Sequence, residues 1–364
     1  MIKGLGNFTC DLYQRLAKNQ NIFFSGYSIS SALALAYLGA RGETKAQMEK
    51  AMGYVPDATE AIKVLIDLGT SLNTADGKIE TKVGNAIWVQ NDLKLTQEFL
   101  AATMEVSDFI RKVDYKNAVE GARVEINKWI AEKTNNLIKD LIPEKALTNL
   151  TRLVLTNAIY FNGKWSNQFD PKLTREEEFH NLGGSTSQVE LMYMNKTKCR
   201  YYEDWGFQFM ALPYGDGTAE LLVVLPKPDC FDAIDKLVTY PQLIKMSSSA
   251  KNKEKVKLWL PKFKLQYKND IASTLSETMP KAFSNADFSG ITGNKDLFIS
   301  NIIHEAVVDV TEEGTEAAAA TAVVMRLKCL IPSDPIMKVD RPFIFAIWDA
   351  RNNVPMFMGR VVKL

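Results

Sequence analysis

The segment from Glu312 to Cys329 constrains the fold most, because two structural interpretations of it conflict. Its run of alanines favours a short helix, since alanine has the highest intrinsic helix propensity and Thr315 suits an N-cap. With a period of two, however, every charge after Thr315 falls on one face, which is typical of a strand with one face in a core. The uncharged face carries Thr315, Ala317, Ala319, Thr321, Val323, Met325 and Leu327, and the other carries Glu316, Ala318, Ala320, Ala322, Val324, Arg326 and Lys328. A segment suited both to an exposed loop and to a strand is a candidate conformational switch.

Composition argues against several classes of protein. The chain of 364 residues has 44 basic and 43 acidic residues, and a net charge of +1 gives no reason to expect nucleic acid or a membrane as a partner. No linker-like stretch or internal repeat divides the sequence, so we expect one domain over residues 1–364. No apolar run approaches membrane-spanning length. The cysteines lack metal-ligand spacing and are expected to be free thiols; they are Cys10, Cys199, Cys230 and Cys329.

Catalytic chemistry has little support in the sequence. His180 and His304 are the only histidines, too few for a multi-histidine metal site, and we expect no bound metal. The motifs of nucleophile-elbow hydrolases, zinc proteases and P-loop enzymes are absent. The stretch from Ser248 to Lys251 has the S-x-x-K spacing of some acyl-transfer enzymes, but it lacks the companion motifs. We therefore expect a protein that is not an enzyme and that needs no cofactor.

Apolar patterns predict the main elements of the fold. Residues 5–18 and 124–141 have helical spacing, and the second helix is expected to close at Pro143. The apolar run 153–161 predicts a strand covered on both faces, in which Asn157 needs a hydrogen-bond partner. Ser25 or Ser28 is expected to cap a helix that runs to Gly39. Further strands are expected at 86–90, 221–225, 256–263, 343–348 and 356–362, the last two as a hairpin.

These motifs resemble those of the serpin family over nearly the whole chain, from about residue 5 to its end. The serpin loop pattern of an acidic residue, Gly, Thr, Glu and a run of small residues is matched by Glu312, Gly314, Thr315, Glu316, Ala317, Ala318, Ala319 and Ala320. Other matches are the segments 161–165, 340–343 and 358–360, whereas Gly26 stands where the family usually has Pro. The resemblance implies an α+β, single-domain serpin fold with three β-sheets, about nine helices and an exposed reactive-centre loop at about residues 312–332.

The resemblance also implies roles for particular residues. The loop residues listed above would form the hinge, and Trp165 would lie at the breach, where insertion of the loop begins. The shutter beneath the sheet would consist of Ser25, Ser28, Asn157 and His304, with Asn157 and His304 in contact. The family's seventeen-residue spacing, counted from Glu312, puts the reactive bond at Lys328 and Cys329, with Arg326 and Leu327 as an alternative cut site.

The implied function is inhibition of trypsin-like serine proteases by suicide-substrate trapping. The protease would cleave after Lys328 and stay covalently attached while the loop inserts into the main sheet of a metastable fold. The alternatives are inhibition of chymotrypsin-like, elastase-like or cysteine proteases, and a non-inhibitory carrier, chaperone or storage serpin. We expect a monomer whose partner is the protease. A trypsin-like target favours extracellular action slightly over cytoplasmic action, although this chain shows no secretion signal.

Overall fold

A computed structural model of the chain describes residues 1–315 and 334–364. The helices among these residues are α1 (Ile2–Leu16), α2 (Gly26–Tyr37), α3 (Gly42–Met52), α4 (Ala58–Leu72), α5 (Gln97–Ala102), α6 (Val119–Lys133), α7 (Phe231–Lys236), α8 (Tyr240–Ser249), α9 (Ala272–Ser276) and α10 (Ser289–Thr292), with 3₁₀ turns at Met104–Phe109, Pro171–Leu173 and Pro280–Ala282. The strands are β1 (Ile22–Phe24), β2 (Ile79–Gln90), β3 (Ile110–Val113), β4 (Leu153–Lys164), β5 (Arg175–His180), β6 (Thr186–Glu203), β7 (Phe207–Tyr214), β8 (Ala219–Pro226), β9 (Lys251–Pro261), β10 (Phe263–Asp270), β11 (Asn301–Val310), β12 (Gly314–Thr315), β13 (Ile336–Lys338), β14 (Phe343–Asp349) and β15 (Val354–Val361).

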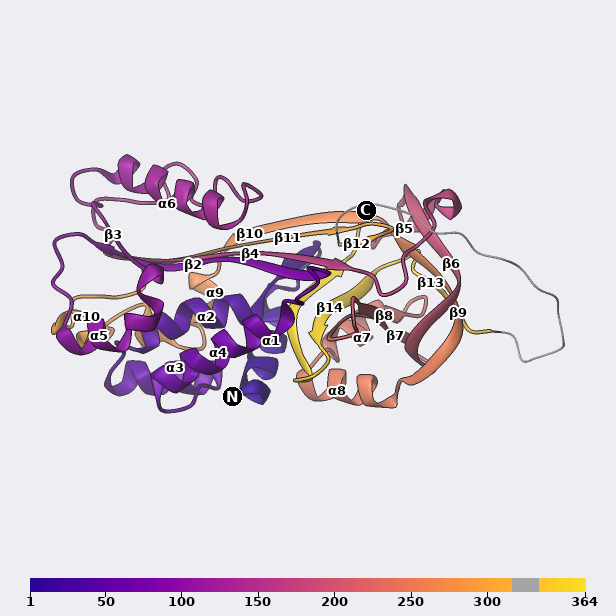
Figure 1. The fold of residues 1–364 in the computed structure, drawn as a ribbon, viewed down its shortest axis with the longest axis horizontal. Helices are drawn as coiled ribbons and strands as arrows, with labels where there is room; N and C mark the ends of the chain where they lie inside the picture. The colour runs from indigo at the N-terminus through magenta and orange to yellow at the C-terminus, as the bar shows by residue number, and fades with distance from the viewer. Residues whose placement is uncertain (316–333) are drawn as a thin grey trace.

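The expected α+β architecture is present, and the strands of the described residues join into two sheets (Figure 1). A six-stranded sheet has the order β10-β11-β4-β2-β3, with β12 paired to β4. A nine-stranded sheet has the order β1-β15-β14-β8-β7-β6-β9-β13, with β5 paired to β6. Three sheets were expected. The pairings give two because the 18-residue strand β6 pairs with β9 along most of its length and also with both β5 and β7.

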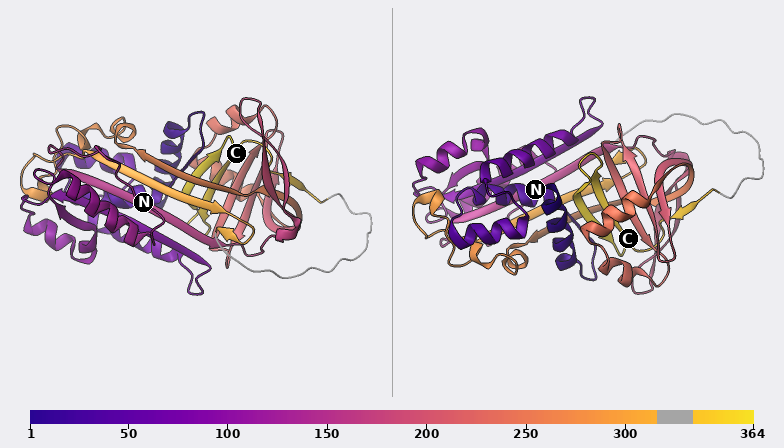
Figure 2. Two further views of the ribbon diagram at one scale, coloured as in Figure 1. Left: turned by 90° about the horizontal axis from the view of Figure 1, so that it is seen from above. Right: turned by 90° about the horizontal axis from the view of Figure 1, so that it is seen from below.

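Strand β4 is covered on both faces, as its continuous apolar run predicts. Leu155 and its odd-numbered neighbours face the main core, on the side of helices α1 to α4. Val154 and other even-numbered residues face a second apolar cluster, which includes Ile126 and Trp129 of α6. Helix α6 therefore lies across the outer face of the six-stranded sheet, whose long strands lie side by side in Figure 2. The alternation buries both faces of the strand.

The start of α2 explains one departure from the serpin pattern. Ser25 caps the helix, because its hydroxyl accepts the backbone N–H of Ser28 at 3.0 Å. The next residue, Gly26, is packed so closely against Thr9 of α1 that an added Cβ would lie 2.0 Å from the Thr9 hydroxyl. A residue without a side chain is therefore required here by the packing of α1 on α2.

Helix α6 ends earlier than its apolar pattern predicts. It stops at Lys133, whereas the sequence pattern predicted a helix to residue 141. Asn135 and Asn136 follow with positive φ angles of 51° and 61°, a left-handed conformation that asparagine tolerates better than most residues and that ends a helix. The apolar residues beyond this turn, Ile138 and Leu141, are buried without being helical. These buried residues happen to have the spacing of an apolar helix face, so the sequence pattern predicted a longer helix.

Other sequence expectations concern the cysteines and the lysine-rich strand. Within the described residues, Cys10, Cys199 and Cys230 are free, as expected. Burial raises the pKa of the Cys199 thiol to about 12, so this thiol is unreactive at neutral pH. The lysines at the start of β9 are solvent-exposed, which agrees with the interpretation of this stretch as the solvated face of a strand. In the part of the chain that is described, no helix combines the length and apolarity needed to cross a membrane.

Candidate functional site: the seam between β4 and β11

Three strands of the six-stranded sheet place polar side chains in one buried row. Asn157 of β4 is paired in register with Asn85 of β2 on one side and with His304 of β11 on the other. Asn157 and His304 are fully buried, and Asn85 is nearly so. Buried amides and imidazoles are costly unless they are hydrogen-bonded, so the row needs internal partners.

His304 is held neutral by its two partners and by its burial. Its Nδ1 lies in short hydrogen-bonding contact with the amide oxygen of Asn157, and its Nε2 lies 3.3 Å from the backbone N–H of Ser25. An amide oxygen only accepts and a backbone N–H only donates, so the ring carries its proton on Nδ1. Burial lowers the pKa of His304 to about 3. A second proton on Nε2 would eliminate the hydrogen bond from Ser25.

Asn157 connects the imidazole to helix α2. Its amide nitrogen donates to the Ser28 hydroxyl and to the Asn85 side-chain oxygen, both at 2.7 Å. Ser28 in turn donates to the Asn85 oxygen at 3.0 Å, and the Asn85 amide nitrogen donates to the Ser28 carbonyl at 3.0 Å. The Ser25 hydroxyl donates to the carbonyl of Met356 in β15 at 2.8 Å. The structure thus brings Ser25, Ser28, Asn157 and His304 together.

Asn85 is the member of this network that the sequence analysis did not identify. The strand predicted at residues 86–90 begins seven residues earlier, at Ile79, and includes it. A polar amide among buried neighbours in a strand was the available signal, the same one that drew attention to Asn157. The register that puts Asn85 beside Asn157 is a tertiary fact that the linear sequence does not contain.

The two central strands are paired along only part of their length. The parallel ladder between β11 and β4 runs from Asn301 opposite Val154 to Val307 opposite Tyr160. At the other end of the seam, the chain turns after β11 and returns as β12. There Gly314 pairs with Lys164 and Thr315 with Gly163, antiparallel to β4. Gly314 and Thr315, the last described residues before residue 334, are therefore paired with the end of β4.

The turn into β12 depends on Gly314. Its φ of +145° lies in a region that residues with a side chain rarely adopt, and an added Cβ would lie 2.1 Å from the carbonyl oxygen of Gly163. Thr311 closes the turn, because its backbone N–H donates to the Gly314 carbonyl at 2.8 Å and its hydroxyl donates to the same oxygen at 3.1 Å. Only glycine allows this close approach of the two backbones.

Trp165 holds the same turn from the side of β4. Its indole ring stacks on Tyr214 with the ring centroids 4.3 Å apart, and the residue is 3% exposed. The indole N–H donates to the Thr311 carbonyl, and the Trp165 backbone N–H donates to the Glu313 carbonyl, both at 2.9 Å. Trp165 therefore hydrogen-bonds to the backbone of the turn that leads into β12.

Glu312 is fixed by a separate set of contacts. Its carboxylate accepts from the Thr174 hydroxyl at 2.8 Å and lies 3.4 Å from the ammonium of Lys262. Lys262 also pairs with Glu190 at 3.1 Å. Burial disfavours the charge on Lys262, but Glu190 and Glu312 outweigh burial and raise the pKa of the ammonium. Glu312, the first of the predicted hinge residues, is thus attached to the body of the molecule.

The remaining predicted site residues lie outside the described residues. These are the hinge residues Glu316, Ala317, Ala318, Ala319 and Ala320, the reactive-bond residues Lys328 and Cys329, and the alternative cut site Arg326 and Leu327. Among the residues that are described, no three His, Cys, Asp or Glu side chains gather in a way that could hold a metal ion.

Comparison with known proteins gives consistent results. A family model for "Serpin (serine protease inhibitor)" matches residues 3–364. The chain is 35% identical to the leukocyte elastase inhibitor of Bos taurus, over 97% of each chain. It resembles the crystal structure of Serpin48 from the insect Tenebrio molitor, with a TM-score of 0.87 and 32% identity over 100% of this chain and 97% of that one. It also resembles human thyroxine-binding globulin in complex with its ligand, with a TM-score of 0.87 and 29% identity over 99% of this chain and 97% of that one.

Proposed function

Because the chain belongs to the serpin family, we propose that it inhibits trypsin-like serine proteases by suicide-substrate trapping, with cleavage between Lys328 and Cys329. The observation that carries this proposal is the pairing of Gly314 and Thr315 with the end of β4. If this pairing were extended after cleavage, the following residues would lie along the seam between β4 and β11 as an inserted strand. The protein would act as an inhibitor and not as an enzyme, as one domain over residues 1–364 with a reactive-centre loop at about 312–332.

The chemistry of the first step is that of ordinary proteolysis. The protease serine Oγ attacks the carbonyl carbon of Lys328, and its proton passes through the catalytic histidine to the departing amine of Cys329. The peptide bond breaks, and an ester joins Lys328 to the protease. A long cationic side chain at this position suits a specificity pocket with an acidic residue at its base. The partner in the covalent complex is the target protease, and the inhibitor itself acts as a monomer.

Insertion of the cleaved loop would follow the register that β12 sets. Since Thr315 pairs with Gly163, odd-numbered loop residues would face the main core with the odd-numbered residues of β4, and even-numbered residues would face the side of α6. The face without charges would therefore enter the main core. Thr321 would arrive at the level of Asn157, between Asn157 and His304.

The energetics of insertion favour the inserted state. The new strand would replace the parallel ladder between β11 and β4 with antiparallel pairing on both of its sides, which adds backbone hydrogen bonds. It would also separate Asn157 from His304, whose contact spans the seam. Breaking the buried row would oppose insertion, and the uncleaved protein would be kinetically trapped.

Two alternatives have a specific observation behind them. The similarity to the leukocyte elastase inhibitor favours an elastase-like or chymotrypsin-like target, for which Met325 or Leu327 would precede the cut bond. The similarity to thyroxine-binding globulin favours a non-inhibitory carrier serpin. A cysteine protease target and cleavage after Arg326 also remain alternatives to the main proposal.

The decisive experiment mixes the protein with trypsin at near-equal amounts and separates the products by denaturing gel electrophoresis. Trapping predicts a band near the mass of trypsin plus that of the cleaved inhibitor, whose intact chain has a mass of 40.8 kDa. Lys328→Ala should remove this band, whereas the matched control Arg326→Ala should retain it. Complete cleavage after Lys328 without a covalent band would refute trapping of trypsin, and the same assay with elastase, chymotrypsin and papain would then test the alternatives.

A further inference from the structure

A hollow of 180 Å³ lies between the turn that joins β6 to β7 and the helices α7 and α8. Its floor is apolar, because the side chains of Phe207, Ile234 and Met246 are buried there. Two exposed apolar side chains border it, since Trp205 is 83% exposed and Leu237 is 51% exposed. The hollow is smaller than the roughly 300 to 1,000 Å³ of pockets for drug-sized ligands, so it suits a small chemical group.

The turn that carries Trp205 is fixed by hydrogen bonds. One carboxylate oxygen of Asp204 accepts the backbone N–H of Gly206 at 2.9 Å and that of Phe207 at 3.1 Å. The Asp204 backbone N–H donates to the Phe207 carbonyl at 3.1 Å. The Lys227 backbone N–H donates to the Gly206 carbonyl at 2.9 Å, which ties the turn to the end of β8. The backbone beneath the indole is therefore ordered before a ligand arrives, which lowers the entropic cost of binding.

Three aromatic rings and one carboxylate line the hollow. The rings are those of Tyr202, Trp205 and Phe207, and the carboxylate is that of Asp204. The ring centroids of Tyr202 and Phe207 are 6.0 Å apart, and the two rings are tilted by 54°. Aromatic faces attract cations, and several rings around one small space are the usual binding site of a quaternary ammonium group. Such a cation has no N–H to donate, so an apolar floor does not leave it short of hydrogen bonds.

Helix α8 supplies three polar side chains to the same hollow. Gln242, Lys245 and Ser249 are spaced by three and four residues, which places them on one face of the helix. None of the three side chains has a hydrogen-bond or ion-pair partner among the described residues. An amide, an ammonium and a hydroxyl can all donate to an anion. Of the described residues that line the hollow, Asp204 and Lys245 alone are charged, and their opposite signs suit a ligand that carries both charges.

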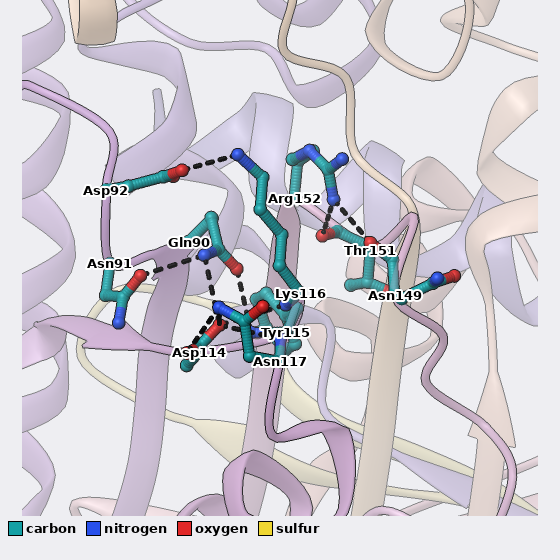
Figure 3. Close-up of polar contacts among 10 residues, drawn as sticks. All are labelled: Gln90, Asn91, Asp92, Asp114, Tyr115, Lys116, Asn117, Asn149, Thr151 and Arg152. Carbon is teal, nitrogen blue, oxygen red and sulfur yellow. Dashed lines mark hydrogen bonds and ion pairs between the residues drawn. The ribbon is translucent and has the colours of Figure 1, made fainter.

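The polar cluster in Figure 3 differs, because its members are partners of one another. It joins the end of β2 to the segments that follow β3 and precede β4. Gln90 bridges Asn91 and Asp114 at 2.8 and 3.3 Å. Lys116 pairs with Asp92 in the same cluster. Groups that already bond to one another gain little from a ligand, whereas the polar groups on α8 have their bonding capacity free.

We propose that the hollow binds a phosphocholine group, with the quaternary ammonium among the three rings and beside Asp204, and the phosphate at Lys245. The hollow is separate from the seam and from the hinge turn, so this binding goes beyond protease inhibition and does not depend on it. The same group occurs as free phosphocholine and as the headgroup of phosphatidylcholine. Both sources present the same pair of opposite charges.

The test measures the binding of phosphocholine by isothermal titration calorimetry and by tryptophan fluorescence. Of the six tryptophans, Trp205 is the one that is exposed, so saturable binding should change an emission signal that Trp205→Phe removes. In calorimetry, Trp205→Ala should weaken binding about tenfold, because the ring is lost. Trp205→Phe keeps an aromatic face and should bind within about threefold of the unmodified protein.

Two further variants address the charges. Asp204→Asn keeps the oxygen that accepts the two backbone N–H groups but removes the negative charge, and should weaken phosphocholine binding about fivefold. Lys245→Met should weaken phosphocholine binding about fivefold and leave the binding of choline unchanged, because choline has no phosphate. Lys63→Met, at an exposed lysine of α4, is the matched control and should leave both unchanged.

The outcomes decide both the site and the source of its ligand. Binding of phosphatidylcholine vesicles with a shift of the Trp205 emission would support a lipid headgroup, and binding of free phosphocholine alone would support a soluble ligand. The proposal is wrong if phosphocholine shows no saturable binding, or if Trp205→Ala binds it as tightly as the unmodified protein. Equally strong binding of phosphatidylglycerol vesicles would also overturn it. Should Trp205→Ala lower the thermal unfolding midpoint, the comparison of choline with phosphocholine in Lys245→Met decides the question, and equal losses for the two ligands would refute the proposal.

Discussion

The hinge end and the middle of the seam between β4 and β11 are held together by different kinds of contact. At the hinge, the turn into β12 is held by the backbone pairing of Gly314 and Thr315 with β4 and by the hydrogen bond from the Trp165 indole N–H. In the middle, side chains of β2, β4, β11 and α2 form a closed, fully buried hydrogen-bond network. The hinge contacts extend along the path of insertion, whereas the network crosses it. If the loop inserts as proposed, the strand would begin to form at the hinge, and separating Asn157 from His304 would oppose its further progress.

The largest expected effect is at the hinge. Thr315→Arg or Ala317→Pro should abolish trapping and leave cleavage after Lys328 intact, because a charge on the inward face or a residue without an N–H stops strand formation. Mass spectrometry of the products and gel electrophoresis with trypsin would measure both. Ala318→Ser, on the opposite face of the same segment, is the control and should still trap. Normal yields of covalent complex in both hinge variants would contradict the assigned hinge.

The next effect concerns the buried row. Asn157→Ala leaves the His304 N–H and the Ser28 hydroxyl short of partners, which should lower the free energy of unfolding by about 2 to 4 kcal/mol. Thermal unfolding would report it, together with faster spontaneous loss of inhibition at 37 °C. Asn269→Ala is the matched control, because Asn269 pairs with His304 in register, whereas its side chain donates to the Tyr267 hydroxyl and not to the buried row. If both variants lost the same free energy of unfolding, the buried row would have no special contribution to stability.

Acid should weaken the same row through His304. The unfolded histidine takes up a proton near its usual pKa of about 6.5, whereas the folded one does so only near about 3. Between these values the unfolded state binds more protons, so stability falls as the pH falls, by about 2 kcal/mol between pH 7 and pH 5. Denaturant midpoints at several pH values would measure it. His304→Gln should flatten this dependence, and His180→Gln, at an exposed histidine, should not.

The smallest effect concerns the indole N–H at the hinge. Trp165→Phe keeps an aromatic ring against Tyr214 but removes the hydrogen bond to the Thr311 carbonyl, which should cost about 1 kcal/mol of stability. Trp205→Phe, at an exposed position, should cost nothing measurable. A loss for Trp165→Phe larger than that for Asn157→Ala would contradict the expectation that the middle of the seam contributes more stability than its hinge end.

The sequence predicted elements and partners where local pattern or family resemblance was sufficient. It predicted β4 with two buried faces, the C-terminal hairpin of β14 and β15, and the meeting of Asn157 with His304. It did not predict the end of α6 at Lys133, because the buried apolar residues after the turn at Asn135 and Asn136 have the same spacing as an apolar helix face.

The contacts that the sequence did not predict join residues far apart in the chain. Asn85 in the buried row and the ion pair of Glu312 with Lys262 depend on strand register and on the packing of distant segments. No local pattern encodes such contacts. The assignment of the reactive bond to Lys328 remains a prediction from the resemblance.

The pairing of β1 with β15 has a consequence for how the protein is made. Residues 22–24 lie against residues 358–360, and Phe23 stacks between Phe345 and Phe357 of the two strands of the C-terminal hairpin. During synthesis on the ribosome, β1 therefore lacks its partner strand β15 until nearly the whole chain has been made. A nascent chain halted before the hairpin would expose β1 and the edge of its sheet. Such intermediates are the natural substrates of chaperones, and truncation before residue 354 should yield insoluble protein.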